Sequence, residues 1–282
     1  MKRKYHLRNS RHRARTGSGN SQPTEQMMTF GEHLEVLRQM LLRILAVTLA
    51  ITVVVFCFKD ATWRLLLAPS QWDFVTYRWI EHLLQGLGVD FHFAEYHIQL
   101  IATDLSSQFM RHITTAFHLG LLGASPYILF ELFRFVSPAL YDNERRHSVA
   151  VAVVIYALFI VGVLMTYFVL FPISFRFLGN YSVSDQIHST ITIDSYIRTF
   201  TSLTLVMGLV FQLPIIAFFL AKMGLITSAL LSRYRRHAFI VIMFVAAVIT
   251  PPDLMTLILV SMPLYLLYEV SIRVVRWTAK TD

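Results

Sequence analysis

The run from Val149 to Phe171 carries no charged side chain and is long enough to cross the hydrocarbon core of a bilayer. It reads VAVAVVIYALFIVGVLMTYFVLF. In lipid every backbone amide needs a hydrogen-bond partner within the chain, and an α-helix supplies one most simply. The run therefore predicts a transmembrane helix, and it places the chain among membrane proteins.

Five further apolar stretches accompany this run. The candidate spans are 37–58, 114–134, 149–171, 200–221, 237–250 and 254–272. Only 15% of the residues are charged, against about 25% in soluble domains, which excludes an ordinary water-soluble protein. The fifth stretch is short, because the sixteen residues between Arg236 and Asp253 reach only about 24 Å. It either re-enters the membrane or crosses where the bilayer is thin.

Lysine and arginine residues divide unevenly between the two sides of this topology. Seven lie in the first fifteen residues and nine more on the same side, against six at most on the other. The positive-inside rule then predicts an all-α integral membrane protein with six transmembrane helices and both termini in the cytoplasm. We expect residues 1–28 to be a disordered basic cytoplasmic arm, 29–275 a membrane domain and 276–282 a short tail.

The long segment after the first span carries aromatic residues suited to a membrane interface. These are Trp63, Trp72, Tyr77 and Trp79. Apolar and polar residues alternate there at near-helical spacing, so we expect short helices that cap the outer face. Pro69 should end the first of these helices after Leu67.

Few side chains in the spans suit catalysis or metal binding. The sequence has no HExxH helix, P-loop or intramembrane aspartate pair, and its single cysteine, Cys57, cannot form a disulfide or a thiolate metal site within the chain. We therefore expect no enzyme, metal or cofactor. His118 reads more readily as a hydrogen-bonded or interfacial histidine than as a ligand. Gln212 is either an interhelical hydrogen-bonding group or a polar contact on a lipid-facing or cavity-facing wall.

The loop FVSPALYDNERRH, residues 135–147, places Asp142 and Glu144 on the side that the charge count makes basic. One interpretation is that Arg145 and Arg146 pair with these acids and satisfy the loop locally. The other is that the acids bind an arginine ligand, because a guanidinium group can bond a carboxylate through two parallel hydrogen bonds.

Five motifs, taken in order, resemble the TatC family, the six-span core of the twin-arginine translocase. They are GEHLEVLR, LIATDLSSQFM, FVSPALYDNERR, FQLPIIAFFLAKMGLI and ITPPDLMT. The resemblance covers residues 29–275. It implies a concave, glove-like bundle with two short last helices and helical outer caps.

The resemblance implies a receptor for twin-arginine signal peptides on folded precursors, and an assembly platform for single-span partner subunits of the TatA and TatB type. Transport driven by the protonmotive force across the bacterial cytoplasmic (inner) membrane is implied with it. The expected partners are these subunits in a hetero-oligomer of several copies, the signal peptides and membrane lipid, and no nucleic acid.

The family's functional residues carry over by motif. The matching positions are Glu144 for the arginine-binding carboxylate, Phe135 and Leu140 for the lining of the same site, Gln212 for an intramembrane polar contact, Pro69 for the proline of the first outer segment and Asp253 for the acid of the last outer turn.

One motif departs from the family pattern, which usually reads His-Leu-x-Glu-Leu-Arg. Residues 33–38 here read HLEVLR, so the glutamate is displaced by one residue, about 100° around a helix. Either the helix enters the membrane rotated about its axis, so that Glu35 reaches the site, or Glu32, which lies one turn before Val36, substitutes for the family glutamate. We expect Glu35 to be the binding residue.

From the residues alone, a second class of function stays open. This alternative is a proton- or ion-coupled secondary transporter of a small solute, with Gln212 and His118 along its path. A membrane hydrolase would need a reacting pair of side chains that the sequence does not offer.

Overall fold

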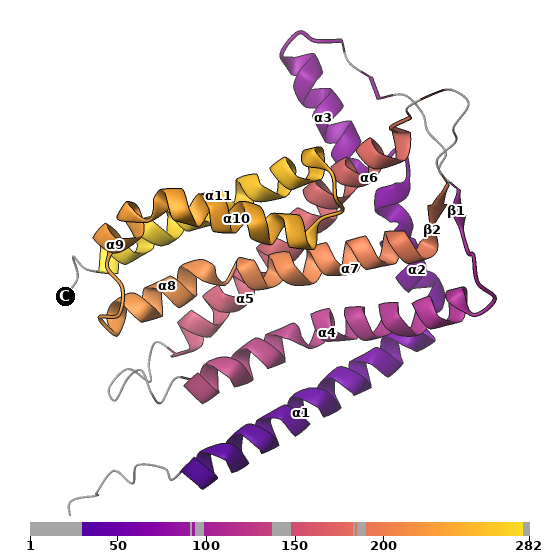
Figure 1. Ribbon diagram of the computed structural model, residues 1–282. Coiled ribbons are helices and arrows are strands. Elements are labelled where there is room, and N and C mark those ends of the chain that lie inside the picture. The colour runs from indigo at the N-terminus through magenta and orange to yellow at the C-terminus, as the bar shows by residue number, and fades with distance from the viewer. Residues whose placement is uncertain are drawn as a thin grey trace, which may run out of the picture. The chain divides into compact units, whose positions relative to one another are not determined.

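The computed structural model describes residues 30–90, 92–93, 99–136, 148–182, 184 and 190–278, which are mostly helical (Figure 1). The elements follow in the order α1 (Phe30–Cys57), α2 (Lys59–Leu67), η1 (Ala68–Ser70), α3 (Val75–Gly86), β1 (Leu100–Ile101), α4 (Ser107–Val136), α5 (Ser148–Met165), η3 (Thr166–Leu170), α6 (Phe171–Asn180), β2 (Ile191–Thr192), α7 (Ile193–Val210), α8 (Leu213–Lys222), α9 (Ser228–Arg233), α10 (Arg235–Ile249) and α11 (Leu254–Thr278). Two compact units meet between Gln39 and Met40, inside α1.

Five helical runs in the described residues are long and apolar enough to cross a membrane. They are Leu34–Cys57, Ser107–Phe135, Val151–Asn180, Ile193–Lys222 and Leu254–Thr278. The predicted fifth span corresponds to α10, whose 15 residues reach about 22 Å. Five predicted spans are thus helices of crossing length, whereas a crossing by α10 stays a prediction.

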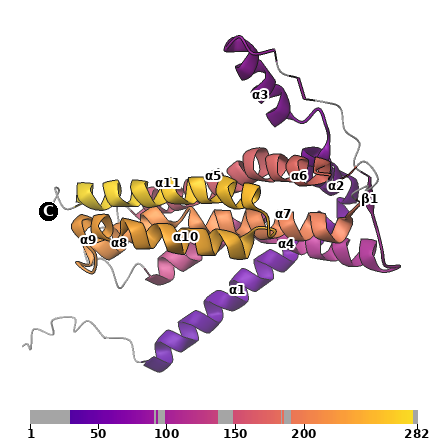
Figure 2. The ribbon, with the colours of Figure 1, turned by 45° about the horizontal axis from the view of Figure 1, so that its top comes forward.

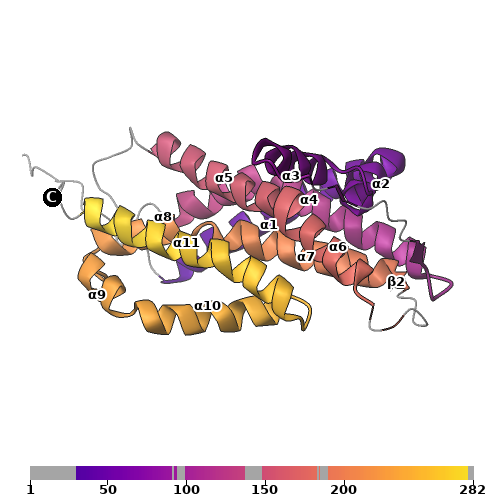
Figure 3. The same cartoon turned by 90° about the horizontal axis from the view of Figure 1, so that it is seen from above.

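The long helices of the unit from Met40 onward lie side by side (Figures 1, 2 and 3). Helix α7 packs against α4 and α5, and α11 packs against α8 and α10. We call the end of this unit that holds α2, α6, β1 and β2 the strand end. The end where α4 stops, α5 starts and α9 lies is the loop end.

The third span is longer than its apolar run predicts. It continues from α5 through the π-helical turn η3 into α6 and ends at Asn180, so the predicted end at Phe171 is wrong. Proline is tolerated in the first turn of a helix, and Pro172 occupies that position in α6. Pro172 has no N–H for the carbonyl four residues back, that of Phe168, and the Thr76 hydroxyl donates to this oxygen instead.

The strand end is capped by short helices, as the sequence predicts. Helix α2 ends at Leu67, and Pro69 lies buried in the next turn, η1. Helix ends leave carbonyl groups without intrahelical donors. Two tyrosines from the spans supply donors here: Tyr196 Oη donates to Leu66 O at 2.7 Å, and Tyr167 Oη donates to Leu65 O at 2.8 Å.

Aromatic rings fill the core beneath this cap. The Phe171 ring lies 5.0 Å from that of Tyr196 and 5.1 Å from that of Phe200, both edge to face. Tyr77 of α3 is only 2% exposed, and its hydroxyl donates to Pro172 O at 2.8 Å. The prediction that Tyr77 belongs to an interfacial aromatic belt is therefore wrong.

The two segments that lead into α4 and α7 pair with each other at the strand end. Strands β1 and β2 are parallel, with Leu100 opposite Ile191. Thr192 then caps α7, because its hydroxyl accepts a hydrogen bond from Ser195 N at 3.2 Å. One turn into α4, Arg111 forms an ion pair with Asp194 of α7.

Two glycines allow α5 and α7 to approach closely. A Cβ at Gly208 would lie 2.7 Å from the Phe159 ring, and a Cβ at Gly162 would lie 2.7 Å from Met207 O. Small residues serve this purpose widely in membrane helix pairs, since lipid provides no hydrophobic force that favours association. The interface leaves no room for even one methyl group at either position.

We predict that Gly208→Ala lowers the stability of the folded protein by about 1 to 3 kcal/mol, because the added methyl overlaps the Phe159 ring. The midpoint of thermal unfolding in detergent measures this. Gly86→Ala is the matched control, since nothing lies within 4 Å of a Cβ there. Equal midpoints for the two variants would contradict the close contact.

Candidate functional site

The predicted arginine-binding loop lies between two described helices. Residues 137–147, with Leu140 and Glu144, fall outside the described residues. Phe135 is half-buried in the last turn of α4. Two residues earlier, the Phe133 ring lies 6.0 Å from the Phe219 ring of α8. The last turns of α4 therefore lie at the loop end, beside α8.

One turn before Phe135, α4 carries a buried carboxylate that belongs to none of the family motifs. Glu131 is 7% exposed, and its Oε1 accepts a hydrogen bond from Tyr127 Oη at 3.0 Å. A buried acid needs such a partner, because desolvation of its charge is costly. From the sequence alone, Arg134, three residues later on the same helical face, is the expected ion-pair partner of Glu131.

Glu35 is on the first unit, in the first part of α1. It is exposed, forms an ion pair with Arg38 at 3.2 Å and accepts a hydrogen bond from Gln39 Nε2 at 3.1 Å. Val36 is exposed as well. Glu32 belongs to the same helix, but its side chain is not among those described. The motif is thus helical, and the one-residue displacement does turn the glutamate about 100° from the family position.

Gln212 lies where the fourth span breaks between α7 and α8. Its backbone N–H donates to Leu209 O at 3.0 Å, three residues back, so the Gly208 carbonyl loses the donor that a continuous helix would supply. The Gln212 side chain compensates, because its Nε2 lies 3.5 Å from Gly208 O. Pro214, in the first turn of α8, fits a new helix start.

The same amide group also joins two spans. Gln212 is 8% exposed, and its Nε2 donates to Ile155 O of α5 at 3.2 Å. Of the two sequence-based interpretations, this geometry favours interhelical hydrogen bonding. A contact with a partner helix stays a prediction.

His118 is buried more deeply than an interfacial histidine would be. It is 3% exposed and packs edge to face against Phe200 at 6.4 Å between ring centroids. Neither ring nitrogen has a hydrogen-bond partner among the described residues. The expected hydrogen bond to this histidine is therefore not found in that part of the chain.

Pro69 and Asp253 both lie at turns. Pro69 shapes η1 at the strand end. Asp253 lies in the turn between α10 and α11 and caps α11, because its Oδ1 accepts a hydrogen bond from Thr256 N at 2.6 Å. In Figure 1 this turn does not reach the strand end, because α10 has only 15 residues. Both residues thus have a local structural reason for their type.

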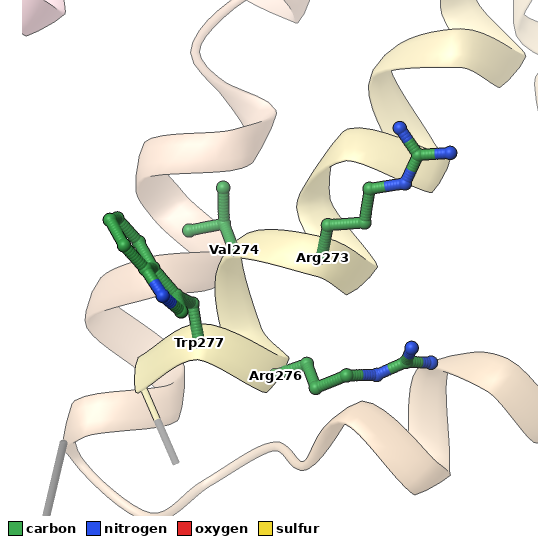
Figure 4. A pocket seen from close by; sticks show the side chains of 4 residues that line it. All are labelled: Arg273, Val274, Arg276 and Trp277. Carbon is green, nitrogen blue, oxygen red and sulfur yellow. The ribbon is translucent and has the colours of Figure 1, made fainter. Parts of the chain in front are cut away.

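A hollow of about 330 Å³ lies at the C-terminal end of α11 (Figure 4). Arg273, Val274, Arg276 and Trp277 line it. Two guanidinium groups repel further cations, so this hollow is not suited to a ligand that carries paired arginines. Among the described residues, no group of three or more histidine, cysteine or acidic side chains could hold a metal ion.

Comparison with known proteins identifies the family. The family model for the Sec-independent protein translocase protein, TatC, matches residues 32–263. The chain belongs to the TatC family. A TatC protein of Blattabacterium sp. subsp. Periplaneta americana is 33% identical over 90% of this chain and 97% of its own length. One from Desulforapulum autotrophicum is 32% identical over 88% of this chain and 84% of its own length.

A solved structure agrees with the TatC sequences. The crystal structure of a twin arginine translocase receptor, TatC, superposes with a TM-score of 0.70 at 27% identity, covering 88% of this chain and all of that one. The family predicted from the motifs and the all-α membrane fold are confirmed. Translocase membership, with several membrane-spanning helices, describes a multi-pass membrane protein and supports neither a small-solute transporter nor a known enzyme.

We predict that Gln212→Leu destabilises the TatC fold by about 0.6 to 2 kcal/mol, because Ile155 O and Gly208 O lose their side-chain donor. Thermal unfolding in detergent measures the loss, with the exposed Gln85→Leu as control. Gln212→Glu should lower the stability further than Gln212→Leu at neutral pH, because an ionised carboxylate has no hydrogen to donate. Stability should recover on lowering the pH, and a pH-independent Gln212→Glu variant would contradict the donor role.

Proposed function

We propose that this protein is the receptor for twin-arginine signal peptides and the assembly platform of a Tat translocase. The observation that carries the proposal is the family match over residues 32–263, together with a structural neighbour that is itself a twin arginine translocase receptor. The described spans support it further, since Gln212 Nε2 donates to the carbonyls of Ile155 and Gly208 and so joins two spans.

The charge distribution supports a cytoplasmic loop end. The described basic residues on the elements at this end are Arg134, Lys222, Arg233, Arg235, Arg236, Arg273 and Arg276. Positively charged connections stay on the cytoplasmic side. In the proposed topology both termini and the 137–147 connection are cytoplasmic, α10 makes the sixth crossing, and the membrane is the bacterial cytoplasmic membrane.

A basic surface repels a peptide that carries two arginines, so recognition requires carboxylates at defined places. Glu144 is the proposed primary partner, with Phe135 and Leu140 as the apolar lining of the site. Phe135 lies at the end of α4, directly before the connection that carries the other two residues. Arginine suits this site better than lysine, because its planar group can make two parallel bonds to one carboxylate.

Glu35 is the proposed second carboxylate. Its present partner, Arg38, is exposed, and an exposed ion pair contributes about 0 to 1 kcal/mol. A signal-peptide arginine can therefore replace Arg38 at small cost. Glu32 stays the alternative, one helical turn earlier.

The proposed assembly includes single-span subunits of the TatA and TatB type, several copies of this protein and surrounding lipid. Folded precursors cross at the expense of the protonmotive force. Gln212 is the proposed intramembrane contact for a partner, with Pro69 and Asp253 as functional positions toward the other face.

Our first prediction for this function concerns Glu144. The purified protein in lipid should bind an Arg-Arg signal peptide more tightly than its Lys-Lys counterpart, and Glu144→Gln should remove about 1.5 to 3 kcal/mol, roughly 10- to 150-fold in affinity. Fluorescence titration of labelled peptides measures this. Asp142→Asn in the same loop is the matched control. If folded Glu144→Gln keeps the Arg-Arg preference, the assignment of the site is wrong.

A second prediction separates Glu35 from Glu32. Glu35→Gln should weaken Arg-Arg peptide binding, whereas Arg38→Gln should keep it or strengthen it up to about fivefold, because the competing guanidinium is removed. The same titration measures both. Weakening by Glu32→Gln but not by Glu35→Gln would transfer the role to Glu32.

A further inference from the structure

Helix α3 exposes more apolar surface than its packing uses. Its packed side includes the buried Thr76 and Tyr77. Four apolar residues, spaced four positions apart, are exposed nonetheless: Val75 at 60%, Trp79 at 64%, Leu83 at 48% and, just beyond the helix end, Leu87 at 78%. We call these four residues the α3 stripe. Single exposed apolar residues are common, but a continuous row on one helix calls for a partner.

The polar residues of α3 lie on another side. At 100° per residue, the exposed Arg78, His82 and Gln85 fall within an arc of about 60°, which borders the stripe at Val75 and faces away from Leu83 and Leu87. The stripe lies between this polar side and the packed side. The apolar side of the helix is thus wider than the part that the protein covers, and the polar residues occupy a different side. Amphipathic helices that lie in a membrane surface have this pattern.

Two hydrogen bonds fix the start of α3 beside the far part of the third span. The Thr76 hydroxyl donates to Phe168 O, and the Tyr77 hydroxyl donates to Pro172 O. From Val149, where the uncharged run of this span begins, Phe168 is about 29 Å along the helix and Pro172 about 35 Å. The hydrocarbon core is about 30 Å thick. A hydrocarbon core that starts with this run ends near Phe168, so we infer that α3 begins close to the outer boundary of the core.

Helix α3 leaves this point across the direction of the spans. Figures 1 and 2 show α4, α7 and α11 running along the length of the unit, while α3 projects sideways from the strand end. A helix that starts at the headgroup level and runs across the spans stays near that level along its length. The surface that it meets there is the lipid leaflet.

We propose that α3 is an interfacial helix whose stripe, Val75, Trp79, Leu83 and Leu87, inserts into the lipid leaflet at the strand end. Tryptophan favours this depth, because its ring is apolar and its N–H can reach water or headgroups. Arg78 and His82 then face the headgroups and water. The helix fixes the strand-end cap at a constant depth, and this role does not depend on signal-peptide binding.

Site-directed spin labelling tests the proposal. In a Cys57→Ala background, nitroxides are placed by Leu83→Cys on the stripe and by Gln85→Cys on the polar side, and the proteins are reconstituted in phosphatidylethanolamine and phosphatidylglycerol vesicles. Power saturation compares collision with oxygen, which concentrates in lipid, and with a water-soluble nickel complex. The oxygen-to-nickel ratio should be severalfold higher at position 83 than at position 85. Leu87→Cys provides a second stripe position if the first variant folds poorly.

Two results would overturn the proposal. Equal ratios at the two positions, with high nickel accessibility, would show that the stripe lies in water. Exclusion of both reagents at position 83 would show that protein, such as a second copy of this chain, covers the stripe. Arg-Arg peptide binding to the labelled proteins is measured separately, so that failure of the receptor proposal and failure of the lipid contact are distinguishable.

Discussion

A backbone carbonyl that is shielded from water needs a donor from the protein, and side chains supply one at three helix breaks of this structure. At the break between α7 and α8, the Gln212 side chain donates to the Gly208 carbonyl, to which the Gln212 backbone N–H would donate in a continuous helix. At the end of α2, Tyr167 and Tyr196 donate to the last carbonyls. At Pro172, Thr76 donates to the oxygen that proline cannot reach.

These donors also hold the elements together. The tyrosines hold the strand-end cap against the third and fourth spans. Gln212 joins α5 to the end of α7, near the close approach of these two helices at Gly162 and Gly208. None of the donors belongs to α1, α4 or the 137–147 connection, which carry the proposed signal-peptide site. Substitutions at that site can therefore change binding without removing the contacts that define the fold.

The sequence predicts much of this architecture because proline and apolar length act locally. Pro69 predicts the end of α2 at Leu67, and the run of uncharged residues predicts the third span. The end of that span was misjudged, because α6 continues past the apolar run where the cap and α7 cover it. Tyr77 was misassigned for a similar reason, since its hydroxyl finds a partner in Pro172 O that lies 95 residues away in the chain.

The sequence by itself determined the membrane class, the helical spans, the cap and the TatC family, because each depends on apolar length, charge count or motifs read along the chain. Only the tertiary structure decided that Gln212 bonds to Ile155 O and Gly208 O, that Gly208 must stay without a side chain, and that α3 turns its stripe away from the protein. These features depend on which backbone oxygens and rings come close in space, and residue type alone does not specify such neighbours.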